Sequence, residues 1–341
     1  MTVPAAEGLY MPAEWQPHER CWMAWPCREE VWDGRIEETR QAYAEVARAI
    51  ADFEPVTMIA NPADVAAASL ACGRGVEILP MDIDDSWMRD AGPTYVVDGK
   101  GQIAGCDWHF NAWGNKYDFY NNDARLAEAL LAHQGIRRLE APFVLEGGAV
   151  HTDGEGTLLT TESVLLNPNR NPGMSRHETE QCLRDWLGVE KIIWLPAGYH
   201  EDETDGHVDN IACFVRPGVV LAASCPDQSD PNYEVFSANL EILRGSTDAK
   251  GRELQVLTLD QPARMEEDGK RLSSSYVNFY IANGGIVMPV FEDRRDNAAY
   301  RTVAQAFPDH KVVRVPSTDI IRGGGCIHCI TQQQPAAGRS P

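Results

Sequence analysis

Apolar positions recur with the period of a helix in four stretches of the chain: residues 35–53, 123–135, 175–188 and 294–307. In the first stretch, RIEETRQAYAEVARAIADF, one helical face carries Ile36, Tyr43, Val46, Ala47 and Ile50. The third stretch opens with Ser175 and Glu178, the spacing of a capping box, and closes at Gly188. We therefore expect four helices that each bury one face.

Short runs rich in β-branched residues lie between these helices, at residues 56–60, 76–81, 191–196, 254–259 and 311–316. Turn pairs between apolar stretches also predict hairpins, at Asp98 and Gly99, Asp153 and Gly154, Pro217 and Gly218, and Asn283 and Gly284. Helices that alternate with hairpins favour an α/β protein with several mixed sheets over one parallel sheet.

Five similar polar turns are spaced along the chain, and each enters or leaves a pair of strands. They begin at Ser86, Leu145, Thr204, Ser275 and Arg322. Repeated units of this size are typical of blades or repeats, whose polar turns can meet at a common centre. No Pro- or Ser-rich linker divides the chain, so we expect residues 1–341 to form one domain of about five units.

Composition narrows the class of protein. Hydrophobic residues make up 43% of the chain, which excludes a disordered protein, and no apolar run approaches the roughly 20 residues that a membrane helix needs. The N-terminal stretch lacks the pattern of a secretory signal, so we expect a soluble cytoplasmic protein with no membrane partner. The net charge of −21 argues against binding nucleic acid. It fits a cationic small-molecule substrate, and equally well a charge that serves solubility alone.

The stretch RGGGCIHCIT raises three chemical possibilities, because Cys326 and Cys329 flank His328. A structural zinc site needs a second pair of ligands, and no other C-x-x-C pair occurs in the chain, so we expect no metal. A thioredoxin-like redox pair should open a helix early in a βαβ unit, whereas this pair lies close to the C-terminus. The third possibility is a glycine-framed loop that presents one reactive thiol.

A reactive thiol needs a general acid or base and a nearby positive charge. His207 in ETDGHVDN is the best-placed candidate, because the acids Asp205 and Asp209 lie close to it in sequence. A lone histidine in such a turn is otherwise a solvated loop residue. Asp90 pairs with its neighbour Arg89, caps a turn, or works with Asp209 to grip a planar guanidinium cation.

Six stretches together closely resemble the agmatine deiminases of the guanidino-group-modifying superfamily, which also contains bacterial peptidylarginine deiminases. They are MPAEWQPHERCWMAWP, DDSWMRDAGPTYV, LEGGAVHTDGEGTLLTTESVLLNPNRNP, ETDGHVDNIACFVRPG, SSSYVNFYIANGGIVMP and GGGCIHCITQQQP. The resemblance extends from residue 11 to residue 335. It implies a five-bladed α/β propeller, the pentein fold, with pseudo-fivefold repeated units and the active site on the central axis.

The resemblance also implies roles for individual residues. Cys329 matches the nucleophile, His207 the general acid and base, and Glu146 the carboxylate that orients this histidine. Asp90 and Asp209 match the pair that binds the guanidinium, Trp87 a wall of the pocket, and Gly325 a position beside the reacting centre. One position departs from the pattern: these enzymes usually have Asn where this chain has Cys326.

The implied reaction is the hydrolysis of agmatine to N-carbamoylputrescine and ammonia, in polyamine (putrescine) biosynthesis, through a thiouronium on the cysteine and without a cofactor. Residues 201–203, an acidic run, are candidates for binding the terminal ammonium of agmatine, or else form a solvated loop. The alternatives are a peptidylarginine or free-arginine deiminase, and a non-catalytic propeller that binds cations. The family also implies a homodimer or a higher homo-oligomer.

Overall fold

The computed structural model describes residues 3–337, so the ends of the predicted domain 1–341 lie outside the described residues. The described chain holds five separate mixed sheets of three or four strands and one two-stranded ribbon. Their strands are β18 (Thr331–Pro335), β1 (His18–Ala24), β2 (Val56–Ala60) and β3 (Val76–Pro80); β4 (Thr94–Val97), β5 (Ile103–His109) and β6 (Arg137–Val144); β7 (His151–Thr152), β8 (Thr157–Thr161) and β9 (Lys191–Leu195); β10 (Ala212–Arg216), β11 (Val219–Ser224) and β12 (Gln255–Asp260); β15 (Tyr280–Ala282), β16 (Gly285–Val290) and β17 (Lys311–Pro316); and the ribbon β13 (Glu266–Glu267) with β14 (Lys270–Arg271).

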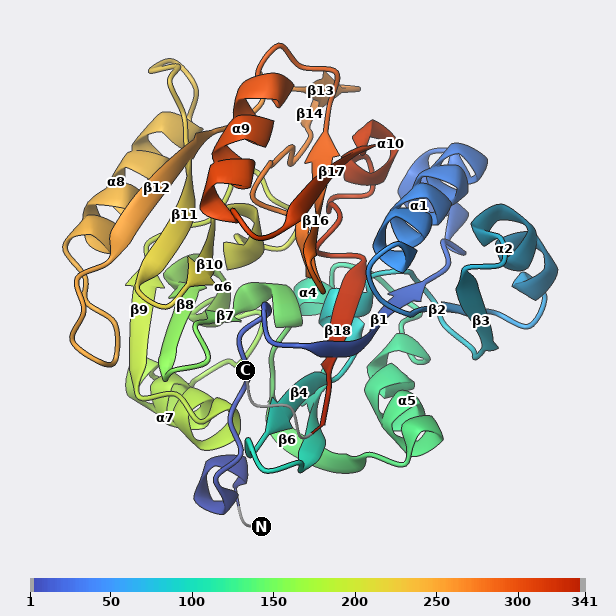
Figure 1. Cartoon of the computed structure of the whole chain (residues 1–341), viewed down its shortest axis with the longest axis horizontal. Coiled ribbons are helices and arrows are strands. Elements are labelled where there is room, and N and C mark those ends of the chain that lie inside the picture. Colours follow the sequence, from blue (N-terminus) through green and yellow to red (C-terminus); the bar gives the residue numbers. More distant parts are fainter. Residues whose placement is uncertain (1–2, 338–341) are drawn as a thin grey trace.

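The five sheets share one plan: an antiparallel pair of strands, then a helix, then a third strand parallel to the second. Thus β4 and β5 form a hairpin, the helix α5 (Leu126–Gln134) follows, and β6 returns parallel to β5. Three further sheets repeat this order around α7 (Arg176–Leu187), α8 (Asn232–Arg244) and α9 (Asp296–Ala306). Figure 1 shows the sheets at successive positions around the middle of the molecule.

The fifth sheet joins the two ends of the chain. The C-terminal strand β18 pairs antiparallel with β1, and β2 returns parallel to β1 after α1 (Ile36–Ala51). A fourth strand, β3, is added after α2 (Val65–Cys72). This pairing brings β1, near the start of the chain, beside the strand that begins two residues after Cys329 (Figure 1).

Most of the predicted elements are confirmed. All five predicted strands form, and each of the four turn pairs joins two antiparallel strands. The predicted face of α1 is buried, and α7 has the complete capping box, with Gly188 in the left-handed conformation at its end. Residues 123–125 form a 3-10 turn ahead of α5 instead of part of the α-helix.

The strands β1, β6 and β18 and the ribbon of β13 and β14 were not predicted, and neither were several helices and turns. These helices and turns are α2, α8 and the short pieces α3 (Met88–Ala91), α4 (Ala112–Asn115), α6 (Glu162–Leu165), α10 (Thr318–Ile321), η1 (Pro4–Glu7), η2 (Glu29–Trp32), η4 (Gly147–Ala149) and η5 (Val208–Asn210). The sequence of α2 is small and apolar all round and therefore lacks a periodic face, whereas α8 buries Phe236, Leu240 and Leu243 at helical spacing.

The architecture is a mixed α/β fold, and within the described residues no sheet closes on itself. None of the described helices has both the length and the apolar character needed to cross a bilayer.

Candidate active site

The five sheets bring short turns from distant parts of the sequence together. Asp90 lies in α3, Glu146 directly precedes η4, and Asp209 lies in η5, which His207 precedes. The α3 turn contacts η4 and β18, and η4 contacts η5. The predicted candidate residues are thus gathered from turns that lie up to about two thirds of the chain apart.

Asp90 is buried, and it receives hydrogen bonds on both oxygens. The Trp113 indole nitrogen donates to Oδ2 over 2.9 Å, and the backbone N–H of Gly148 donates to Oδ1 over 3.0 Å. Burial raises the pKa of Asp90, protonated His207 opposes this, and the neighbouring carboxylate of Asp209 adds to it. The pairing of Asp90 with Arg89 that the sequence left open is wrong, because Arg89 lies 3.4 Å from Glu14 instead.

Asp209 and Cys329 are in contact. The Cys329 Sγ lies 3.5 Å from Oδ2 of Asp209 and 3.3 Å from Nδ2 of Asn278. The other oxygen of Asp209, Oδ1, is buried without a hydrogen-bond partner among the described residues. Burial, together with the carboxylates of Asp209 and Asp90, raises the pKa of the Cys329 thiol well above its ordinary value. In the free site the thiol is therefore protonated at neutral pH.

His207 lies between two carboxylates in a fully buried position. Its Nδ1 is 3.8 Å from Asp90 and its Nε2 is 3.7 Å from Glu146. Burial disfavours the imidazolium, but the carboxylates of Asp90, Glu146 and Asp209 outweigh this effect and raise the pKa of His207 to about 9. His207 is therefore a cation at neutral pH and has a proton to give.

Glu146 is held by a cation that was not predicted. Arg170 donates from Nε to Oε1 of Glu146 over 2.7 Å, and it also pairs with Asp205 and donates to the carbonyl of Thr204. Burial raises the pKa of Glu146, but the nearby imidazolium of His207 and the charge of Arg170 reverse the effect and lower it overall. Arg170 thus ties the carboxylate beside His207 to the turn that carries His207.

Gly148 lines the space between the charged groups. A Cβ at this position would lie 2.5 Å from Nδ1 of His207, 2.8 Å from Oδ2 of Asp209 and 3.1 Å from Oδ1 of Asp90. Only a glycine leaves room for these three side chains to converge. Gly148 belongs to the stretch LEGGAVH, but nothing in the sequence alone distinguishes it from its neighbour Gly147.

A narrow cavity opens beside these groups, with about 320 Å³ of empty space including part that is open to solvent. It is lined by Trp87, Asp90, Trp113, Tyr117, Glu203, Thr204, the glycines at 323–325, and Cys329. Trp87 stacks on Trp32 with ring centroids 5.6 Å apart. A Cβ on Gly325 would lie 2.4 Å from the Trp87 ring, so this glycine lets the loop approach the wall of the cavity.

The residues of the acidic run have different surroundings. Glu203 lines the cavity, Asp202 is buried and accepts a hydrogen bond from Thr204, and Glu201 is exposed beside His200.

Cys326, the position that departs from the family pattern, is fully buried, and burial raises the pKa of its thiol to about 12.

His328, considered above only as a metal ligand, lies between two carboxylates. Its Nδ1 is 2.9 Å from Asp209, and its Nε2 is 2.8 Å from Glu14. The backbone N–H of His328 donates to Oδ1 of Asn278 over 2.9 Å. The sequence singled out neither Glu14 nor Asn278.

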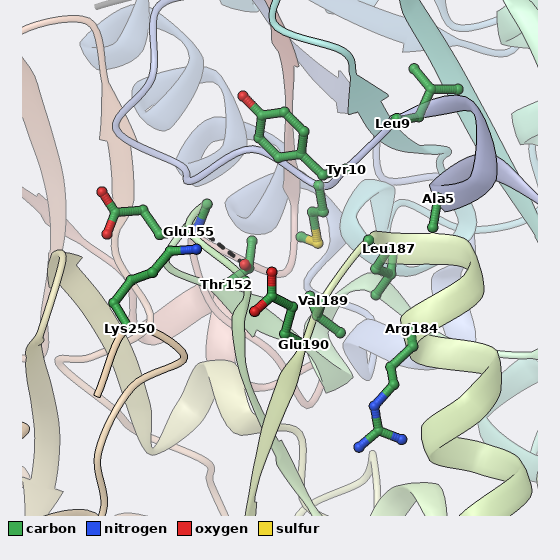
Figure 2. Close-up of a pocket in the computed structure, with 15 residues that line it drawn as sticks. Ala5, Leu9, Tyr10, Thr152, Glu155, Arg184, Leu187, Val189, Glu190 and Lys250 are labelled. Atoms are coloured by element: carbon green, nitrogen blue, oxygen red, sulfur yellow. Dashed lines mark hydrogen bonds between the residues drawn. The ribbon is translucent and has the colours of Figure 1, made fainter. Parts of the chain in front are cut away.

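A wider hollow lies outside this site, between the N-terminal segment, the β7–β8 hairpin and the end of α7 (Figure 2). It encloses about 910 Å³ of empty space, open solvent included. Tyr10, Glu155, Arg184, Glu190 and Lys250 reach it from different elements (Figure 2).

A buried thiol, an imidazolium and two carboxylates lie together beside the cavity, an arrangement typical of an enzyme active site. The family model described as Porphyromonas-type peptidyl-arginine deiminase matches residues 10–335, and the chain belongs to this family.

Individual relatives align with this chain over almost the whole of both sequences. The chain is 48% identical to the agmatine deiminase of Pseudomonas aeruginosa (strain LESB58), an alignment that covers 98% of each chain. Its structure is similar to that of the agmatine deiminase of Enterococcus faecalis, with a TM-score of 0.96, 37% identity and 98% of each chain covered. It is also similar to a C. jejuni agmatine deiminase variant with substrate bound, with a TM-score of 0.89, 28% identity and 97% of each chain covered.

Proposed function

We propose that this chain hydrolyses agmatine to N-carbamoylputrescine and ammonia, without a metal or an organic cofactor. The observation that carries the proposal is a pair of buried carboxylates beside a thiol. Among the described residues, Asp90 receives its hydrogen bonds from an indole and a backbone amide, and Oδ1 of Asp209 receives none. Buried carboxylates need compensating charge, and a bound guanidinium supplies it. Relatives named agmatine deiminase support the choice of substrate.

The two carboxylates hold the guanidinium and fix its carbon near Cys329. The planar cation offers paired N–H groups that match a carboxylate, and Oδ1 of Asp209 is open to receive them. Positioning of this kind can remove several kcal/mol, on the order of 7 or more, from the barrier of a two-reactant step.

Substrate binding also activates the thiol. In the free site two carboxylates hold the pKa of Cys329 high. A bound guanidinium neutralises both and places a positive charge beside Sγ, which favours the thiolate. The nucleophile therefore forms where and when its target is present.

The reaction then follows in two halves. The Cys329 thiolate attacks the guanidinium carbon, protonated His207 gives its proton to a departing nitrogen, and the C–N bond breaks to release ammonia. A thiouronium remains on Cys329. Neutral His207 takes a proton from water, which attacks the same carbon, and the C–S bond breaks to release the ureido product and the thiol. In this scheme Glu146 keeps the His207 ring oriented.

The end of the cavity that lies away from Cys329 distinguishes agmatine from free arginine. We place the terminal ammonium of agmatine near Glu203, the one member of the acidic run that lines the cavity. The described residues that line the cavity include no arginine or lysine to receive the α-carboxylate of free arginine. Trp87 and Gly325 flank the path between the two ends and pack against the carbon chain.

The wider setting is part of the same proposal. The repeated sheet plan supports a five-bladed α/β propeller of the pentein type, a single catalytic domain over 1–341, with the turns of the site on its axis. We also propose a cytoplasmic homodimer or higher homo-oligomer that does not bind nucleic acid and that serves putrescine biosynthesis.

A second candidate is a deiminase of peptidylarginine or free arginine, which the description of the matching family favours.

Measuring the ureido product formed from agmatine, free arginine and a peptidylarginine separates the two candidates. Wild type and Cys329→Ala are compared for each substrate. We expect strong turnover of agmatine alone, and none in the variant. Turnover of a peptidylarginine in preference to agmatine would change the assigned substrate and leave the proposed reaction mechanism unchanged. No ureido product from any of the three would overturn the proposal.

A further inference from the structure

The carboxylate of Asp209 is held by a buried histidine that takes no part in the steps above. His328 lies next to Cys329 in sequence, and its side chain is 4% exposed. Its Nδ1 lies 2.9 Å from Oδ2 of Asp209, and its Nε2 lies 2.8 Å from Oε1 of Glu14. Both ring nitrogens therefore face a carboxylate.

This geometry determines the protonation state of His328. A carboxylate accepts hydrogen bonds, and a neutral imidazole can donate only one, so two short contacts to carboxylates require the imidazolium. Four charged or titratable groups surround the ring: Asp209, Glu14, Arg89, and His151 with ring centroids 6.4 Å apart. Burial and the charge of Arg89 lower the pKa of His328, but Glu14 and Asp209 outweigh them and raise it.

The backbone of His328 is fixed as well. Its N–H donates to Asn278 over 2.9 Å, and its carbonyl accepts from Nε of Arg89 over 3.3 Å. Arg89 also contacts Glu14 at 3.4 Å. The ring therefore has little freedom to turn away from Asp209.

The two oxygens of Asp209 have different surroundings. Oδ2 is occupied by His328 and lies 3.5 Å from Sγ of Cys329, whereas Oδ1 is buried with no partner among the described residues. A carboxylate that is free to rotate would exchange these two oxygens. The bond from His328 prevents this and leaves one oxygen available.

We infer that His328 is a positioning residue: as an imidazolium held by Glu14, it binds one oxygen of Asp209 and turns the other towards the guanidinium of the substrate. The inference rests on the proposed function, because it assigns the open oxygen of Asp209 to the substrate cation. Cys329 and Asp209 act on the substrate directly, and His328 acts through Asp209.

Two variants separate positioning from simple structural support. The amide nitrogen of asparagine occupies the place of Nδ1, and that of glutamine comes near Nε2. His328→Asn therefore keeps a donor for Asp209 and loses Glu14, whereas His328→Gln keeps the donor for Glu14 and loses Asp209. Each variant replaces the imidazolium by a neutral amide and removes the His328 donor from one buried carboxylate, so we expect similar losses of thermal stability.

Agmatine binding is measured by calorimetry on the full chain with Cys329→Ala, which prevents turnover, and KM and kcat are measured with Cys329 present. We expect His328→Gln to weaken binding about 10- to 100-fold, the effect of losing a hydrogen bond to a charged group, and His328→Asn to remain within about threefold of the parent. Equal losses in the two variants, or no loss in either, would overturn the inference.

Two controls keep the result interpretable. If the His328 variants do not fold, Glu14→Gln tests the same chain of contacts: it should weaken agmatine binding several-fold, and unchanged affinity would contradict the inference. If the native protein forms no ureido product from agmatine, the proposed function itself fails. Turnover by the native protein with equal losses in both variants refutes only the role of His328.

Discussion

The narrow cavity beside Cys329 and the wider hollow of Figure 2 differ most in how their charged groups are placed. In the hollow, Glu155, Glu190 and Lys250 are exposed and keep their hydration. In the cavity, Asp90 and Cys329 are buried, and the carboxylate accepts neutral donors only. Burying a charge is costly, so a cluster of buried charged groups marks a site better than empty space does.

The thiol provides the largest expected effect. Cys329→Ala should lower kcat by about 10⁴-fold or more, because it removes the atom that forms the covalent intermediate. Cys326→Ala is the matched control, since it removes a buried thiol three residues away and should leave kcat within about tenfold. Ureido product is measured under saturating agmatine. Comparable losses in the two variants would mean that the thiol of Cys329 has no special role.

The buried carboxylates come next. Asp90→Asn or Asp209→Asn should lower kcat/KM for agmatine about 100- to 1000-fold, because each removes a charged partner of the buried guanidinium. Asp107→Asn is the control, because Asp107 is also buried but is paired with its own cation, Arg138, at 2.6 Å. That variant should lose stability in a thermal melt and keep its kcat/KM. A large loss of activity in Asp107→Asn would show that the loss of any buried carboxylate impairs catalysis.

A single methyl group should have an effect of similar size at Gly148. Gly148→Ala places a Cβ 2.5 Å from the His207 ring, so we expect kcat/KM to fall about 100-fold as the charged groups are forced apart. At Gly75 the nearest atom to such a Cβ is 3.8 Å away, an ordinary contact, so Gly75→Ala should be fully active. Steady-state assays of both variants test this, and an active Gly148→Ala protein would contradict the described convergence.

The pH dependence is expected to be smaller but diagnostic. At neutral pH the free site has both a protonated thiol and a protonated His207, which is one proton more than the reacting pair of thiolate and imidazolium. One proton must leave, so kcat/KM for agmatine should rise up to about tenfold per pH unit until the pKa of His207, about 9. The dependence of kcat should be flatter, because the bound cation already favours the thiolate. A kcat/KM that stays flat between about pH 7 and 9 would show that the free thiol is already ionised.

The smallest effects belong to the wider hollow. Glu190→Gln and Lys250→Met alter exposed charges, so we expect kcat/KM to change by less than about twofold and stability by at most about 0.5 kcal/mol. The same assays and a thermal melt measure this. A marked loss of activity in either variant would show that the hollow contributes to catalysis, and the comparison would then fail.

The parts of the fold that depend on neighbouring residues could be predicted from the sequence. The turn pair Asp98 and Gly99 identifies a hairpin, and the pair Ser175 and Glu178 identifies the start of α7, because each depends on residues only a few positions apart. The small apolar residues of α2 give no such signal, and only packing against the rest of the molecule makes their helix clear.

The site also has some residues that could be predicted from the sequence and others that could not. The six stretches identified the candidates for the thiol, the histidine and the carboxylates, but not the groups that hold them. Glu14 meets His328 across 314 positions of sequence, so the sequence assigned His328 no role once a metal site was set aside. Arg89 and Asp90 are adjacent in sequence, but successive side chains on a helical turn do not face each other, and Arg89 reaches Glu14 instead.

The central claim is that Cys329 forms a covalent bond to the guanidinium carbon in this buried site. The most direct test is the intact mass of native protein quenched with acid during turnover of saturating agmatine, followed by peptide mapping. The account predicts an increase equal to agmatine minus ammonia, located on Cys329 and absent in Cys329→Ala. Ureido product formed without any adduct, or an adduct on Cys326 instead, would contradict it.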